Sequence, residues 1–218
     1  MQFHALADWA AAGAAVDRNG PAISTADSGS EPGPTRLRTM SGPVLVIELA
    51  EAISPTALQR LHELLLRSSA RLEEKRVGEY DLHVRAESLG ITGAGEADGG
   101  RPFLVSHMGS GTGDEEIFDT EHADEADLEA LIGFTPTHAV DVIALCNSPI
   151  DHVVTALLTA TIMDVIGGVV NAELRADQIP ITAALPGLIA TTDSWHAAYG
   201  SSEFLRAWAA EPGFRLVK

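Results

Sequence analysis

The chain of 218 residues has one cysteine, few basic residues and few aromatic residues. The single cysteine, Cys146, excludes an internal disulfide and favours a reducing, cytoplasmic compartment. Fourteen Lys and Arg stand against 31 Asp and Glu, for a formal net charge of −17. A surface this acidic repels phosphate backbones and attracts basic proteins. We therefore expect no nucleic-acid partner and consider a basic protein instead.

A long uninterrupted hydrophobic run is also missing. The most apolar stretch, residues 153–163, contains three threonines and is too short to cross a bilayer. The amino-terminal segment has no basic residue before Arg18 and carries Asp8 within its apolar part, unlike a signal peptide. These features predict a cytoplasmic protein that does not associate with a membrane.

The composition changes near Met40. Residues 1–39 contain an Ala-rich segment and then a stretch rich in Gly, Pro, Ser and Thr, which predicts a flexible amino-terminal extension. Residues 40–218 alternate between strand-like and helix-like patterns, which predicts a single α+β domain. We expect a mixed sheet with a carboxy-terminal helix and strand. The expected helices lie at about 55–75, 150–166 and 201–210, and the expected final strand covers 214–218.

One local pattern occurs twice and predicts two strand–helix–strand units. In each unit an apolar strand is followed by a Ser-Pro pair, at Ser54 and at Ser148. Serine is a favoured helix N-cap, and proline is tolerated at the first helical position because the N–H it lacks has no partner there. Gly167 and Gly168 follow the second helix and suit a left-handed helix end with a close approach to the next strand.

The corner between the second strand and its helix has more than one interpretation. As a site of catalysis, Cys146 and His152 form a thiolate–imidazole pair, and Asn147 or Asp151 orients the ring. As architecture, Ser148 and Asp151 resemble a capping box at the start of an apolar core helix, and this accounts for more of the residues. A third interpretation makes Asn147 and His152 contacts to a ligand or partner.

Residues 114–129 are rich in acids and contain no Lys or Arg. Their spacing does not match a calcium-binding loop, and His122 alone does not make a transition-metal site, so we expect no metal. The glycines at 109–113 lack the Lys and the Ser or Thr of a phosphate loop, so we expect no nucleotide cofactor. The pattern favours a solvated loop that leads into a helix at 124–132. The alternative is a docking surface for a basic protein, formed by Asp114, Glu115, Glu116, Asp119, Glu121, Asp124 and Glu125.

Four segments together resemble an uncharacterised family of small bacterial proteins, mostly from actinobacteria, classed as a domain of unknown function. They are CNSPIDH at 146–152, GGVVNAEL at 167–174, SSEFLRAW at 201–208 and FRLVK at 214–218. The resemblance covers residues 40–218 and carries over no catalytic residue. In size and architecture the chain also resembles the immunity proteins that accompany secreted bacterial toxins, many of which are acidic.

These observations predict a non-enzymatic, acidic, cytoplasmic binding protein without a cofactor. Its specific form would be an immunity-like protein that neutralises a basic toxin. The predicted binding residues are the acids of the docking surface named above, together with Asn147 and His152. The alternative is a small hydrolase that uses His152 with Asn147 or Cys146.

Overall fold

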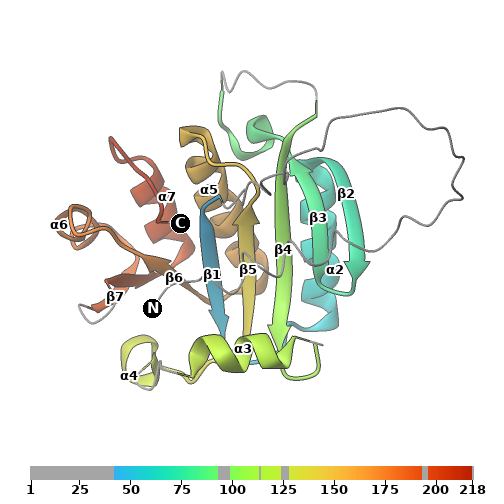
Figure 1. Ribbon diagram of the computed structural model, residues 1–218, viewed down its shortest axis with the longest axis horizontal. Coiled ribbons are helices and arrows are strands. Elements are labelled where there is room, and N and C mark those ends of the chain that lie inside the picture. Colours follow the sequence, from blue (N-terminus) through green and yellow to red (C-terminus); the bar gives the residue numbers. More distant parts are fainter. Residues whose placement is uncertain (1–41, 93–98, 113, 124–127, 193–195, 218) are drawn as a thin grey trace, which may run out of the picture. The chain divides into compact units, whose positions relative to one another are not determined.

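The computed structural model describes residues 42–92, 99–112, 114–123, 128–192 and 196–217. The predictions for residues 1–39 and for Asp124 and Glu125 lie outside these ranges. In the described part of the chain, eight strands form one sheet with the order β2-β3-β4-β5-β1-β6-β8-β7 (Figure 1). The strands are β1 (Val44–Leu49), β2 (Ser69–Arg76), β3 (Glu79–Val84), β4 (Arg101–Gly109), β5 (His138–Ala144), β6 (Val169–Glu173), β7 (Leu188–Thr192) and β8 (Ala197–Gly200).

Helices cover both faces of this sheet. In Figure 1, α2 and α5 lie behind the strands, and α3 crosses in front of them at the lower end. The helices are α2 (Pro55–Ser68), α3 (Glu115–His122), α4 (Leu128–Ile132), α5 (Pro149–Ile166), α6 (Ile179–Thr182) and α7 (Ser202–Ala209), with a short 3-10 turn, η1 (Ala86–Leu89). The main hydrophobic core lies between the sheet and the layer of α2, α5 and α7.

The predicted α+β class is confirmed, and both strand–helix–strand units are present as β1–α2–β2 and β5–α5–β6. The sheet differs from the expected mixed sheet, because every strand pair in the described chain is antiparallel. The strand order explains the difference. The two strands of each unit point the same way, but other strands lie between them, so no parallel pair forms.

Helix α5 is the centre of the core. By length and composition this 18-residue helix could cross a membrane, but more than half of it is buried inside the protein, as in a core helix. Gly167 ends the helix with a positive φ (φ 78°, ψ −154°), but outside the predicted left-handed helical region, whereas the predicted close approach to the next strand is present at Gly168. A Cβ atom on Gly168 would lie 2.6 Å from a side-chain atom of Ile47 and 2.7 Å from the carbonyl oxygen of Glu48. The glycine therefore allows β6 to start close to β1.

The first predicted helix is shorter than expected. Ser54 caps α2 by accepting the N–H of Ala57, as predicted, but the helix ends at Ser68 and residues 69–76 form β2. This segment turns back through Gly78 and pairs with β3 along its length. The backbone hydrogen bonds of that hairpin outweigh the helix propensity of a sequence rich in Leu, Glu, Lys and Arg.

The predicted final strand is absent from residues 214–217 of the described chain. Side chains take up the backbone groups of this segment instead of a neighbouring strand. The Leu216 N–H donates to Nδ1 of His152 at 3.2 Å, and the amide of Gln178 donates to the Arg215 carbonyl oxygen at 2.5 Å. The carboxy-terminal segment is thus attached to α5 and to the residues before α6.

Replacing Leu158 in α5 by alanine should destabilise the protein by about 2–5 kcal/mol, because the side chain is fully buried and its loss leaves a cavity. Leu66→Ala in α2 is the matched control, since Leu66 is 57% exposed and its truncation should change stability by less than about 0.5 kcal/mol. Urea unfolding of the two variants measures both values. Equal losses would show that α5 is not the centre of the core.

Candidate functional site

At the start of α5, Arg101 organises a partly buried group of hydrogen-bonded side chains. The guanidinium donates to the Asp151 carboxylate at 2.5 Å and to the Ser148 hydroxyl at 2.7 Å. Asp151 also accepts the backbone N–H of Ser148 at 2.5 Å and its hydroxyl at 2.7 Å. Burial would raise the pKa of Asp151, but the hydrogen bonds from Arg101 and Ser148 outweigh burial and lower it. The predicted capping box is confirmed, and Arg101 is the member of the cluster that the sequence did not identify.

His152 lies inside the protein. The ring is fully buried, and its Nδ1 accepts the Leu216 N–H. A ring nitrogen that accepts from a backbone amide and is shielded from water is poorly placed to take a proton from a nucleophile or to meet a partner. Cys146 and Asn147 are partly exposed, in the segment between β5 and α5. The corner therefore has the geometry of a helix start and an attachment point for the carboxy-terminal segment.

The acidic segment differs from the expected solvated loop, because Glu115–His122 form helix α3. Two side chains attach its inner face to the protein. Phe118 is buried, and its ring stacks on that of His122 with centroids 4.1 Å apart. The His122 ring bridges to the sheet, with Nε2 2.9 Å from the Glu48 carboxylate and Nδ1 2.9 Å from the Phe118 carbonyl oxygen.

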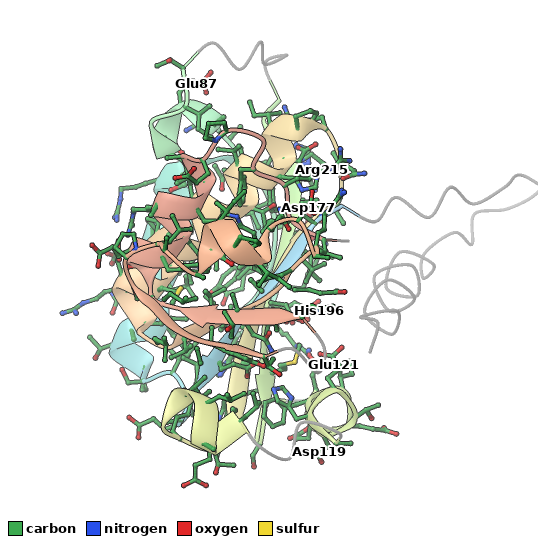
Figure 2. All side chains as sticks on the ribbon, turned by 90° about the vertical axis from the view of Figure 1, so that its left-hand side faces the viewer. Glu87, Asp119, Glu121, Asp177, His196 and Arg215 are labelled. Carbon is green, nitrogen blue, oxygen red and sulfur yellow. The ribbon has the colours of Figure 1, made fainter. Side chains whose placement is uncertain are left out.

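The predicted docking acids have different environments around α3. Asp114 is buried and forms an ion pair with Arg76, which also pairs with Glu79 at 2.7 Å. In Figure 2, Glu121 lies on the side of α3 that faces the middle of the molecule, whereas Asp119 lies on the outer side. The acids that are exposed on the helix are Glu115, Glu116 and Asp119. We call these three residues the acidic face of α3.

A polar cluster lies beneath α3, on the sheet face opposite the main core. Alternation along the strands directs Leu45, Ile47 and Leu49 of β1 toward the core and Glu48 away from it. Glu48 is buried, and besides His122 it binds the side-chain amide of Asn171 on β6 at 3.1 Å. Asp141 occupies the corresponding face of β5. Strand alternation thus brings two acids and an amide from three adjacent strands to one surface.

Asp141 is the most unusual member of this cluster. Its side chain is fully buried, and neither carboxylate oxygen has a hydrogen-bond partner among the described residues. Burial raises its pKa well above the ordinary value, the carboxylates of Glu121 and Glu48 raise it further, and His122 opposes them. The acid is held in its protonated form more firmly than an aspartate in water. We call Glu48, His122, Asp141 and Asn171 the polar cluster.

The two predicted binding regions lie at opposite ends of the sheet. Strand β5 begins at His138, at the end that α3 covers, and leads after Ala144 into the corner (Figure 1). Its seven residues span about 20 Å in an extended strand. The acidic face of α3 therefore does not form one surface with Asn147 and His152. No group of three or more His, Cys, Asp or Glu with the geometry of a metal site occurs among the described residues.

Residues 41–218 match a family described as a family of unknown function (DUF6368). The chain belongs to this family. No curated protein and no solved structure matches the chain significantly. The family assigns no activity to its members, so the polar cluster and the acidic face of α3 must be interpreted from their own chemistry.

Sequence reasoning missed the polar cluster, although a signal for it exists. Glu48 and Asp141 are single acids within strands of mostly apolar residues, VLVIEL and HAVDVIA. An acid that strand alternation buries needs a partner or a proton, and such positions are candidates for functional sites. The partner, His122, is 74 residues from Glu48 in the sequence, so no local pattern connects them.

Asp141→Asn should stabilise the protein, and the gain should grow with pH. Because the folded state holds the Asp141 proton more tightly than the unfolded chain does, this residue makes stability fall as pH rises above about 4. The asparagine removes that dependence. We expect the melting temperature to exceed that of the unaltered protein by at least about 2–4 °C at pH 8, the shift that about 1 kcal/mol produces in a chain of this size. Asp119→Asn makes the same substitution at an exposed position and is the control. If the difference in melting temperature between Asp141→Asn and the unaltered protein does not vary with pH, the raised pKa assigned to Asp141 is wrong.

Asp151→Asn should have the opposite effect. The lowered pKa of Asp151 means that its pairing stabilises the fold above about pH 4 and is lost as the pH falls further. We expect the variant to lose about 3 kcal/mol at pH 7, which is typical of breaking a buried pair, and this loss should shrink as the pH falls below about 4. Asp164→Asn in the same helix is the control, because the Asp164–Arg206 pair is exposed and such pairs contribute at most about 1 kcal/mol. Equal losses for the two variants would contradict the corner geometry.

Proposed function

We propose that the protein binds a basic protein through the acidic face of α3. The observation that carries the proposal is the orientation of this helix. Phe118 and His122 attach its inner side to the sheet, and Glu115, Glu116 and Asp119 are left exposed on a helix that cannot turn freely. Acids held in fixed positions lose less conformational entropy on binding than acids in a solvated loop.

The charge around α3 supports the same proposal. There is no Lys or Arg between Arg101 and Arg175 in the sequence. Arg76 is paired with Asp114 and Glu79. The sequence segment that carries the exposed acids of α3 therefore contributes no Lys or Arg to this part of the surface. A negative surface of this kind accelerates the encounter with a positive partner and weakens as salt is added.

Neutralisation of a basic toxin in the cytoplasm is the specific form of the proposal. The net charge of −17 and a binding surface made of acids suit a cationic partner. The buried, amide-bonded ring of His152 favours this reading over a hydrolase that uses the corner. If the partner is a toxin, its gene should lie beside the gene for this protein, and expression of the partner alone should stop growth until this protein is added.

The experiment reverses the charge of the acidic face. The variant Glu115→Lys/Glu116→Lys/Asp119→Lys is immobilised beside the unaltered protein, and a lysate of the native cell is passed over both. We expect a basic protein to be retained by the unaltered protein and lost from the variant. With that protein purified, the association rate at low salt should fall at least tenfold, about the lower bound for removing electrostatic steering.

A second variant separates position from net charge. Glu63→Lys/Glu87→Lys/Glu203→Lys changes the net charge by the same amount at exposed sites on α2, η1 and α7. Figure 2 places Glu87 at the opposite end of the molecule from Asp119. This control should keep an association rate within about threefold of the unaltered protein at moderate salt, where charges farther apart than about 8–10 Å are screened. Equal losses in the two variants would contradict a docking site on α3.

A further inference from the structure

The contacts of His122 define its protonation. Nδ1 faces the carbonyl oxygen of Phe118, and Nε2 faces the carboxylate of Glu48. A carbonyl oxygen and an ionised carboxylate only accept hydrogen bonds, so both ring nitrogens must donate and the ring must be an imidazolium. If the proton between Nε2 and Glu48 moves from the ring to the carboxylate, the number of protons on the pair stays the same. In either form the pair holds one proton more than a carboxylate beside a neutral imidazole.

The surroundings of this pair are acidic. Asp141 on β5 interacts electrostatically with both members of the pair and with Glu121 on α3: the carboxylates raise its pKa and His122 lowers it. Asn171 on β6 adds a neutral donor to Glu48. Farther along the same face, Arg76 of β2 forms ion pairs with Glu79 of β3 and with Asp114. The positive charge of His122 therefore compensates a group of acids.

Loss of the extra proton should weaken the attachment of α3. A neutral ring can donate from only one nitrogen, so either the contact to Phe118 or the contact to Glu48 is lost. The Glu48 carboxylate would then lose the positive charge that His122 places beside it. An eight-residue helix is too short to be stable alone, so its order depends on such tertiary contacts.

We propose that the His122–Glu48 pair positions α3 through a shared proton, so that the acidic face is presented only while the pair is protonated. This inference rests on the proposed function, because the acidic face of α3 is the docking surface there. His122 and Glu48 are positioning residues, and neither is exposed to a partner on the outer side of the helix. Binding of the basic partner should consequently weaken at alkaline pH, beyond the effect of salt.

Other buried histidines do not belong to this pair. His107 and His138 stack with ring centroids 5.5 Å apart, and strand alternation places them on the face of the sheet that also carries Val140 and Val142. Burial and the neighbouring His138 lower the pKa of His107 to about 4. It therefore stays neutral where the His122–Glu48 pair would lose its proton, and the two titrations can be separated.

The test uses the free full-length protein. Nitrogen NMR of the eight histidines reports the protonation of each ring, and the signal that disappears in His122→Gln identifies His122. Hydrogen exchange over residues 115–122, corrected for the intrinsic effect of pH, reports the attachment of α3. We expect both His122 nitrogens to be protonated at pH 7. As the ring loses its second proton, the protection of α3 should fall by about tenfold or more.

Two variants and a matched control keep the test decisive. His122→Gln keeps a neutral N–H donor toward Glu48, so its α3 protection should vary less than about threefold over the same pH range. Glu48→Gln removes the carboxylate and should make the His122 ring lose its second proton at lower pH. His62→Gln removes the histidine of an exposed pair with Glu74, 3.2 Å apart, and should keep the original profile. A neutral His122 ring at pH 7 beside an ionised Glu48, or α3 protection that ignores the titration, would overturn the inference.

The failure of this inference can be told apart from the failure of the docking proposal. The exchange and NMR measurements are made without a partner, so they test only the His122–Glu48 pair. The association rates of the charge-reversal variants are measured at one pH, so they test only the acidic face of α3. If the α3 charges matter and the pair titrates as described, yet the affinity for the captured basic protein does not fall across that titration, the regulatory role of the pair is wrong.

Discussion

The structure depends on the burial of helix α5. Its 18 residues carry charged side chains only at Asp151 and Asp164, so a large part of its surface must be kept away from water. The sheet covers one side, and α2, α7 and the carboxy-terminal segment cover others. Polar groups within the helix are satisfied internally, since Thr155 and Thr159 each donate to the carbonyl oxygen four residues earlier. Arg101 and Leu216 complete the arrangement at its amino-terminal end.

Burying α5 uses one face of the sheet and decides what the other face can be. The strands next to α5 alternate, so residues that do not face the helix layer are directed to the opposite surface. On β1, β5 and β6 this surface receives Glu48, Asp141 and Asn171. An element covering these groups must offer hydrogen-bond donors as well as apolar area. Helix α3 offers both, as His122 for the carboxylate and Phe118 for packing.

Local chemistry in the sequence predicted the parts of the fold that depend on adjacent residues. The Ser-Pro starts of α2 and α5 and the glycines after α5 are all present. The errors occur where distant segments compete for the backbone. Residues 69–76 pair with β3 instead of extending α2, and Leu216 binds His152 instead of a strand.

The polar cluster could not be found from the sequence for the same reason. Its titratable members come from β1, α3 and β5, and only the folded sheet brings Glu48 and His122 together. A lone acid in an apolar strand identifies a buried carboxyl group but not its partner. The sequence composition showed that residues 114–129 are rich in acids. Which of these acids are exposed depends on how α3 is oriented, which leaves Asp114 buried, Glu121 directed inward and three acids exposed.

The polar contact beneath α3 has a physical advantage over an apolar one. Leucine in place of Glu48 and Asp141 would avoid the cost of burying carboxyl groups, but an apolar surface would let a short helix slide or rotate. The contact from His122 to Glu48 exists in one orientation only, and that orientation directs Glu115, Glu116 and Asp119 outward. A positive ring in the last turn also suits the negative end of the helix dipole. Burial of Asp141 thus lowers the stability of the fold, while the polar contact beneath α3 fixes the direction in which the acids of the helix point.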